Sequence, residues 1–339
     1  MNTGARDPCQ QPVHLDESFA HPFDQYQRYQ DVRVAVQVIQ SRLARDSLRI
    51  LDVGGSPVVS RYLSGHRLVV ANLEVEPGIA LQCDGARLPC RDESCDVAIS
   101  VDTLEHLADR QRLSLVDELL RSSAAYAILI APFASGTTET AERTLYHILR
   151  EALGQEHRFL LEHLQQSLPD LPACLDRIAQ ANASCVVIPS GYLQHWLPLM
   201  IIRHRLWQLP EGGALDRDLE CLYNQQCYWA DHRLPSYRQM IVISKHGDTE
   251  TLQTVRDQLA GARQAEPGPP DLNGVIGLWQ TLRVLPLLEE RDAELAQLRQ
   301  LVIAYQSGRF MRFMAALRRW LHRFRGETRA FPPNELSTD

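Results

Sequence analysis

The sequence predicts an α/β protein with a doubly wound, Rossmann-like sheet, a helical insertion and a C-terminal helical tail. Two observations lead to this prediction. Short apolar runs suited to buried parallel strands alternate with stretches of helical periodicity. Within residues 49–107, each apolar run ends in an acid or a glycine turn. Polar groups placed in this way form a row at the carboxyl edge of a parallel sheet, where open α/β sheets bind ligands.

The first part of the chain reads as a helix followed by successive βα units. Residues 1–25 are polar, and we expect them to form a flexible segment. Apolar residues then recur at helical spacing from Tyr26 to Ala44, which predicts a helix before the first strand. The strands expected after it cover residues 50–53, 68–72, 80–82, 97–101 and 125–131, with a helix over 113–122 before the last of them.

The middle of the chain departs from a minimal doubly wound fold. Residues 138–166 read as helical, within an insertion of about 138–182. Two more strands are expected near the end of the domain, which would span residues 26–247. A second helical insertion, about 190–230, lies between these strands. The strands cover 185–188 and 239–244, and the helices between them cover about 191–206 and 215–229.

A linker over residues 248–274, rich in Pro and Gly, is predicted to join this domain to a tail over 275–326. The tail begins with an approximate heptad pattern of about two repeats, which resembles a short coiled coil, formed by Leu288, Leu295, Leu298 and Val302. A basic helix with large apolar side chains follows over 308–325. Residues 288–325 have two interpretations: docking on a membrane surface or a protein partner, or a solvated amphipathic helix.

Four phrases carry the candidate chemistry, and their order is more informative than any one of them. They are Asp52-Val-Gly54-Gly55, then Glu74, then Asp84-Gly85-Ala86, then a phrase that runs from Asp102 to His106. This order resembles class I S-adenosylmethionine-dependent methyltransferases. The resemblance implies that S-adenosylmethionine is the cofactor, that the glycine turn approaches its amino-acid part, and that Glu74 accepts its ribose hydroxyls. It further implies that Asp84, with the backbone of Gly85 and Ala86, binds the adenine, and that residues 100–106 face the reacting centre.

The residue types support these roles without the resemblance. Gly54 and Gly55 permit positive φ and a close approach of the backbone to a ligand. A carboxylate about 20 residues beyond such a turn is suited to a ribose diol, as in dinucleotide-binding folds. One departure weakens the match: the family's third glycine is absent, and Ser56-Pro57 follows instead. Ser56 can act as an N-cap and Pro57 as the first helical residue, which would preserve the turn.

Methyl transfer to a hydroxyl also requires a group that removes the proton. The candidate catalytic residues are His106, Asp102, His157 and His163, and Asp102 is also a candidate for cofactor binding. Glu156-His157 and Glu162-His163 lie about two helical turns apart. Such pairs suit a base with its orienting carboxylate, or a metal site. Because polar pairs on a helix surface are commoner, we expect no metal site.

Composition limits the classes of partner. The chain has 339 residues, a formal net charge of −7, 45% hydrophobic and 23% charged residues, so nothing in its charge predicts nucleic-acid binding. Its eight cysteines include no Cys-x-x-Cys pair and read as small buried hydrophobes. The polar amino terminus and the lack of a long apolar run predict a cytoplasmic protein, with the tail as a route to the inner face of the membrane. Oligomer formation is left open.

A second, narrower resemblance concerns the acceptor. The phrase over residues 156–163, its continuation Leu168-Pro169-Asp170, and Pro189-Ser190-Gly191-Tyr192 with Trp196 resemble methyltransferases encoded with bacterial surface-polysaccharide genes. That resemblance spans about residues 20–245. It implies O-methylation of a sugar or terminal group of a cell-surface glycan or its precursor. The alternatives are a small-metabolite acceptor, or a non-catalytic scaffold of a glycan-assembly complex on a degenerate methyltransferase fold.

Overall fold

The computed structural model describes residues 21–209, 212–261, 291, 294–300 and 319. The chain divides into two units, Met1–Ile276 and Gly277–Asp339, and the first contains the sheet. The predictions for residues 1–20, for linker residues 262–274 and for most of the tail lie outside the described residues. Within the tail, residues 294–300 are helical, and the side chains of Leu295 and Leu298 are exposed.

The sheet has seven strands in the order β3-β2-β1-β4-β5-β7-β6. Strands β1 to β5 run parallel, whereas β7 pairs antiparallel with both β5 and β6. The predicted α/β class is therefore confirmed, with the last two strands forming an antiparallel closing pair. The bounds are β1 Arg49–Val53, β2 Arg67–Asn72, β3 Leu81–Gln82, β4 Cys95–Val101, β5 Ser123–Pro132, β6 Ser184–Tyr192 and β7 Ser236–Ser244.

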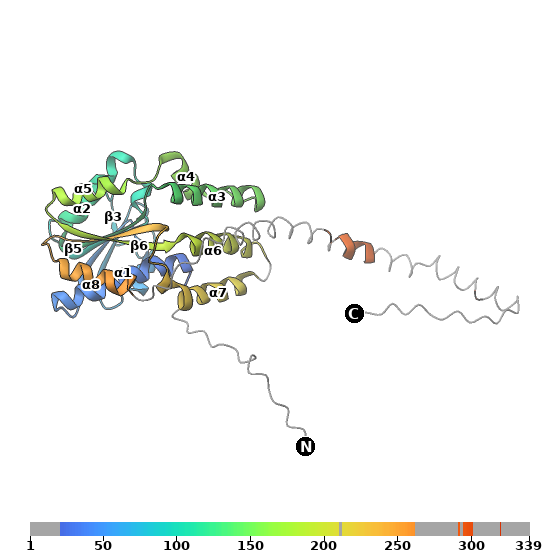
Figure 1. Ribbon diagram of the computed structural model, residues 1–339, viewed down its shortest axis with the longest axis horizontal. Coiled ribbons are helices and arrows are strands. Elements are labelled where there is room, and N and C mark those ends of the chain that lie inside the picture. Colours follow the sequence, from blue (N-terminus) through green and yellow to red (C-terminus); the bar gives the residue numbers. More distant parts are fainter. Residues whose placement is uncertain (1–20, 210–211, 262–290, 292–293, 301–318, 320–339) are drawn as a thin grey trace, which may run out of the picture. The chain divides into compact units, whose positions relative to one another are not determined.

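Helices cover both faces of the sheet (Figure 1). Helices α2 (Asp109–Ser122) and α5 (Leu171–Gln180) lie together on one face, and α1 (Phe23–Leu43) and α8 (Thr249–Ala260) lie on the other. The central strands β4 and β5 are buried on both sides because each face is covered, which explains their nearly continuous apolar sequences. The core under α2 and α5 includes Leu115, Leu119, Cys174, Ile178, Ala98, Leu129 and Ile241.

The first insertion contains three helices, and the first two of them replace the one helical stretch that the sequence predicts over 138–166. Helix α3 (Gly136–Ala152) ends before Gly154, which has φ +61°, and α4 (Arg158–Gln166) begins after His157. The His157 ring accepts a hydrogen bond from the backbone N–H of Leu160 at 3.3 Å and so caps α4. The second insertion contains α6 (Leu193–Leu206), α7 (Gly212–Leu222), a π-helical turn (Tyr223–Cys227) and a 3-10 turn (Tyr228–Ala230).

The predicted linker over 248–274 is wrong at its start, because α8 occupies Thr249–Ala260. Leu252, Val255 and Leu259 are buried and recur at helical spacing, so the helix packs on α1 and the closing strands. Asp248 caps it by accepting from the backbone N–H of Thr251 at 3.2 Å. The domain begins earlier and ends later than the predicted 26–247, since α1 starts at Phe23.

Helix α1 is tied to the closing strands by a buried carboxylate. Asp31 is fully buried and accepts hydrogen bonds from the Ser190 hydroxyl at 2.6 Å and from the Tyr228 hydroxyl at 2.8 Å. His232 lies 2.8 Å from the same carboxylate. A buried polar group is stable only when it is fully hydrogen-bonded, so this network holds α1 against β6 and the second insertion.

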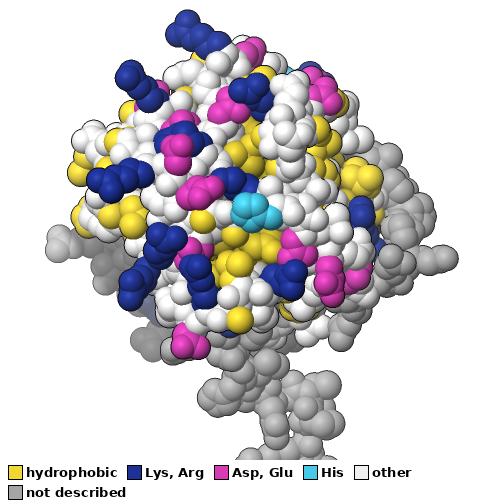
Figure 2. Space-filling model, turned by 90° about the vertical axis from the view of Figure 1, so that its left-hand side faces the viewer, with side chains coloured by type: hydrophobic (Ala, Val, Ile, Leu, Met, Phe, Trp, Pro, Cys, Tyr) yellow, Lys and Arg dark blue, Asp and Glu magenta, His cyan; other side chains and the backbone are white. Residues whose placement is uncertain are grey.

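Basic and acidic side chains are interspersed over the face that Figure 2 shows, so neither sign dominates there. At the amino ends of the strands, Arg49 pairs with Asp96 at 2.7 Å. Arg121 likewise pairs with Asp92 at 2.7 Å.

Among the described residues, no helix has both the length and the apolar character that a membrane crossing requires.

Candidate active site

The carboxyl ends of β1 to β4 bring the four predicted phrases to one edge of the sheet. β2 and β3 pair with Asn72 opposite Gln82, so Glu74 and Asp84 each follow two residues beyond paired positions. β1 lies between β2 and β4, and its glycine turn therefore separates Glu74 from the Asp102–His106 phrase. The order across the edge is Asp84, Glu74, the glycine turn and Asp102, as expected for an extended ligand.

The glycine turn has room for glycine only. Gly54 has φ +76°, and a Cβ atom there would overlap the side chain of Thr103. A Cβ atom on Gly55 would overlap the carboxyl group of Asp52, which lies directly beneath the turn. The amide of Asn72 donates to the carbonyl of Gly55 at 2.8 Å and fixes the turn from the neighbouring strand.

The expectation for the residues after the turn is confirmed. Ser56 is the N-cap of a short 3-10 helix over Pro57–Arg61, and its hydroxyl accepts from the backbone N–H of Val58 at 3.3 Å. Pro57 occupies the start of that helix, where its missing N–H costs nothing. The turn keeps its shape without a third glycine because a cap and a proline supply the chain reversal.

Asp52 is buried, and neither of its carboxyl oxygens has a hydrogen-bond partner among the described residues. Burial raises the pKa of Asp52 from its ordinary value of 3.8 to about 8. An unpaired carboxyl group beneath a glycine turn is a site for a cationic or hydrogen-bond-donating ligand group. The ammonium group of S-adenosylmethionine is of this kind, so the residues at the turn fit the cofactor.

The stability of the cofactor-free protein should fall as the pH rises between about 4 and 8. The unfolded chain releases the Asp52 proton near 3.8, whereas the folded chain retains it up to about 8. In that window the native state binds more protons than the unfolded chain. Each rise of one pH unit therefore lowers the free energy of unfolding by up to about 1.4 kcal/mol. Asp52→Asn should reduce this dependence, measured as the free energy of urea unfolding at pH 5, 6.5 and 8. Equal pH dependence in the two proteins would contradict the assignment.

Glu74 and Asp84 are both exposed, with their carboxylates at the edge. The backbone N–H of Glu74 bonds to the Asn72 side chain at 3.1 Å, so the chain turns immediately after β2. Asp84 accepts from the backbone N–H of Ala86 at 2.9 Å. A Cβ atom on Gly85 would meet Val53 and Leu115, so the backbone there lies directly on the core.

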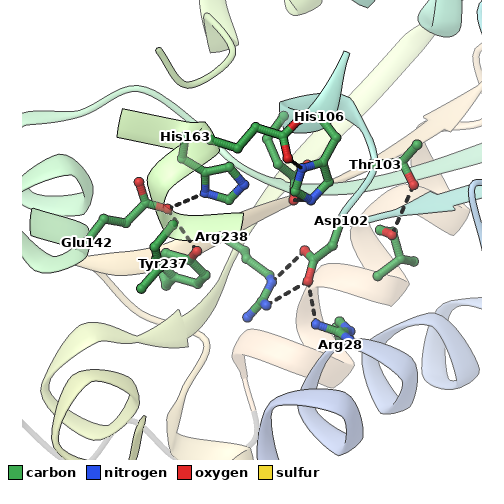
Figure 3. Close-up of polar contacts among 12 residues, drawn as sticks. Arg28, Asp102, Thr103, His106, Glu142, His163, Tyr237 and Arg238 are labelled. Atoms are coloured by element: carbon green, nitrogen blue, oxygen red, sulfur yellow. Dashed lines mark hydrogen bonds and ion pairs between the residues drawn. The ribbon is translucent and has the colours of Figure 1, made fainter. Parts of the chain in front are cut away.

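Asp102 is held between two guanidinium groups (Figure 3). Arg238 donates to both its oxygens at 2.7 Å, and Arg28 donates to one of them. Although burial opposes ionisation, these two cations hold the pKa of Asp102 well below its usual range. A carboxylate so strongly ionised is a poor proton acceptor. The geometry therefore argues against Asp102 as the base and assigns it to orienting the two arginines at this edge.

His106 and His163 lie side by side, with ring centroids 5.0 Å apart, although they come from distant parts of the chain (Figure 3). Each has a carboxylate partner that the sequence pairs did not predict. The Nδ1 atom of His163 lies 2.8 Å from Glu142 on α3, whereas Glu162 lies 3.4 Å from Nδ1 of His106. Burial, and then the charge of His163, lower the pKa of His106 below its ordinary value. Near neutral pH its imidazole is therefore uncharged.

His157 is not part of this group. Its ring caps α4 and contacts His204, with centroids 5.5 Å apart. Burial lowers its pKa. The predicted Glu156-His157 pair therefore has no catalytic geometry, and His157 is a helix cap.

Several residues at the site were not predicted from the sequence. Asn72 was recognisable as the last residue of its strand, and Glu105 adjoins a predicted residue. The others had no local signal, because each reaches the site through tertiary packing. They are Arg28 on α1, Glu142 on α3, and Tyr237 and Arg238 on β7.

A family model described as a methyltransferase domain matches residues 44–124, from the end of α1 to the start of β5. These residues contain the glycine turn, Glu74, Asp84 and the Asp102–His106 phrase. Comparison with curated proteins gives no match.

Solved structures with a similar fold include a magnesium protoporphyrin IX methyltransferase from Synechocystis PCC 6803, which is 11% identical, with TM-score 0.37. That match covers 65% of this chain and 83% of the other. A geranyl diphosphate C-methyltransferase from Streptomyces coelicolor A3(2) is 11% identical, with TM-score 0.34, and the match covers 59% and 69% of the two chains.

The strand order, the glycine turn with its buried acid, and the matched residues lead to one assignment. The protein is an enzyme, and residues 44–124 carry a methyltransferase domain of the class I type, for which S-adenosylmethionine is the methyl donor.

Proposed function

We propose that this enzyme transfers a methyl group from S-adenosylmethionine to a hydroxyl group of a polar acceptor, a sugar unit of a cell-surface glycan or its precursor. The observation that carries the proposal is the polar cluster beside the Asp102–His106 phrase. Asp102, Arg238, His106, His163 and Glu142 meet at the edge next to the glycine turn. Polar groups of this kind suit an acceptor rich in hydroxyl groups better than an apolar one.

The cofactor roles in this proposal follow the order of the strands. Asp52 and the Gly54–Gly55 turn would hold the amino-acid part, Glu74 the ribose, and Asp84 with the backbone of Gly85 and Ala86 the adenine. Glu74 and Asp84 each follow by two residues the paired ends of β2 and β3, so their exposed carboxylates come at the edge where a ribose joined to a base would bind.

The chain's own contribution to transfer is positioning and proton removal. S-adenosylmethionine supplies an already activated methyl group, so holding the acceptor oxygen in line provides most of the acceleration. Arg28 and Arg238, fixed by Asp102, present donors for acceptor hydroxyl oxygens. The uncharged imidazole of His106 offers a lone pair at this edge, and activation of a hydroxyl requires such a lone pair.

Transfer of tritium from methyl-labelled S-adenosylmethionine to an extracted glycan fraction should be detected with the intact protein. It should be lost in Glu74→Ala/Asp84→Ala, because two charged contacts to the cofactor of about 1.5–3 kcal/mol each would disappear. Calorimetry should show at least a 100-fold weaker affinity for the cofactor. Glu76→Ala is the matched control, since Glu76 is an exposed acid of the same loop.

The distribution of label separates the alternatives. Label in a small-metabolite fraction alone would replace the glycan acceptor with a metabolite. Absence of label in every fraction, despite cofactor binding, would favour a scaffold on a methyltransferase fold. Unchanged cofactor affinity in the double variant would contradict the roles of Glu74 and Asp84.

A further inference from the structure

Three potential metal ligands converge at the edge of the sheet that carries the glycine turn. Glu105 and His106 lie in the turn after β4, and His163 lies on α4. One ligand atom from each lies within 4.8 Å of the others. The three therefore meet only through the packing of the first insertion against the end of β4.

Each of the three side chains has a buried polar atom without a hydrogen-bond partner among the described residues. These atoms are Oε2 of Glu105, Nδ1 of His106 and Nε2 of His163. Glu105 is 2% exposed and His163 6%. An unpaired buried polar group costs about 1–3 kcal/mol. Nδ1 of His106 faces the Glu162 carboxylate at 3.4 Å, so the two remaining atoms, on Glu105 and His163, call for a common partner, and an ion is such a partner.

The surroundings of His163 resemble the outer shell of a metal site. Its Nδ1–H donates to Glu142 at 2.8 Å, and the Tyr237 hydroxyl donates to the same carboxylate oxygen at 2.9 Å. With Nδ1 protonated, Nε2 carries the lone pair. A carboxylate that fixes the tautomer in this way is the usual partner of a histidine that ligates a metal.

We propose that Glu105, His106 and His163 bind one divalent transition-metal ion. Two imidazoles and one carboxylate suit Zn²⁺, Mn²⁺, Fe²⁺ or Co²⁺, whereas Mg²⁺ and Ca²⁺ prefer oxygen ligands alone. Bonds of about 2.1 Å would hold two ligand atoms at most about 4.2 Å apart, so small side-chain rotations close the site. Three protein ligands leave coordination positions open for an oxygen atom. The sequence predicted no metal site.

The local charge is compatible with a cation. Burial, and then the charge of Asp102, raise the pKa of Glu105, and a bound cation would offset both effects. Glu162 lies 3.4 Å from His106 and adds a further negative charge. The nearby cations Arg28 and Arg238 are paired with Asp102.

The chemical role of the ion rests on the proposed function. An acceptor hydroxyl bound to the ion would lose its proton to water more readily, as metal-bound water does. The oxygen–methyl bond then forms as the sulfur–methyl bond breaks, and sulfur retains the electron pair. With the ion bound, His106 would act as a ligand in place of its role as the base, and the proton would leave to solvent.

Metal binding can be measured without cofactor or acceptor. Untagged full-length protein, stripped with a chelator, should bind one equivalent of Zn²⁺ in calorimetry and should give a visible Co²⁺ spectrum that Zn²⁺ abolishes. Glu105→Gln and His163→Ala should each weaken binding by at least 100-fold, and Glu142→Gln by about 10- to 100-fold. His147→Ala is the matched control, because His147 is exposed on α3, outside the proposed site, and forms an ion pair with Glu151 at 3.5 Å.

Binding of less than one equivalent, or equal affinity in Glu105→Gln and the intact protein, would overturn the proposal. Glu105→Gln preserves the side-chain shape, so it keeps the test valid if His163→Ala fails to fold. Metal binding without label transfer would instead contradict the proposed function and leave the site intact. Label transfer by chelator-stripped protein, together with absent binding, would refute the site and leave the function.

Discussion

Asp102→Asn is expected to lower the free energy of unfolding by about 3–5 kcal/mol, because it leaves two largely buried guanidinium groups without their shared counterion. The side chain of Arg238 is 5% exposed and that of Arg28 17%. Asp102 has φ +48°, and asparagine tolerates this left-handed backbone, so the substitution isolates the charge. Urea unfolding at neutral pH measures the change.

The matched control for this prediction is Asp92→Asn. Asp92 also pairs with an arginine, Arg121, at 2.7 Å, but its side chain is 77% exposed. Its loss should cost less than about 1 kcal/mol, because solvent screens an exposed pair. Equal destabilisation by the two substitutions would show that burial does not determine the strength of the Asp102 pairs.

Gly55→Ala is expected to abolish detectable binding of S-adenosylmethionine, with at least a 100-fold loss of affinity in calorimetry. The added Cβ atom would overlap the Asp52 carboxyl group beneath the turn. Either the carboxyl group or the turn must then move, and both belong to the predicted cofactor site. Overpacking of a close-packed position typically costs about 1–3 kcal/mol of stability as well.

Gly136→Ala is the control for this second prediction. Gly136 lies in the first turn of α3, and a Cβ atom there would meet open space. It should leave affinity unchanged, and thermal unfolding of both variants separates lost binding from lost folding. Near-normal affinity in a folded Gly55→Ala protein would show that the turn does not contact the cofactor.

Local patterns were sufficient for the sheet and for the glycine turn after β1. Buried strands such as β4 and β5 have nearly continuous apolar sequences, and the turn after β1 depends on glycine and a capping serine within four residues. Helix α8 was missed although its apolar residues Leu252, Val255 and Leu259 have helical spacing. Because proline-rich residues follow α8, the predicted linker began too early, at residue 248, and included the helix.

Local sequence patterns could not predict the partners of the charged residues at the site. Asp102 finds Arg28 and Arg238 at sequence separations of 74 and 136 residues. Glu162 was the candidate carboxylate for its neighbour His163, yet the carboxylate that contacts His163 is Glu142, 21 residues away on another helix. Periodicity specifies which face of an element is buried, but it does not specify which element covers that face.

The sequence alone determined the α/β class, the order of the βα units and the approximate bounds of most strands, because these depend on periodicity and turn chemistry within a few residues. The tertiary structure alone decided which acids and bases meet. It paired Asp102 with two arginines, which argues against its action as a base, and it brought Glu105, His106 and His163 together. Those contacts depend on how α1, α3, α4 and β7 pack around the end of β4, and packing joins residues that are distant in the sequence.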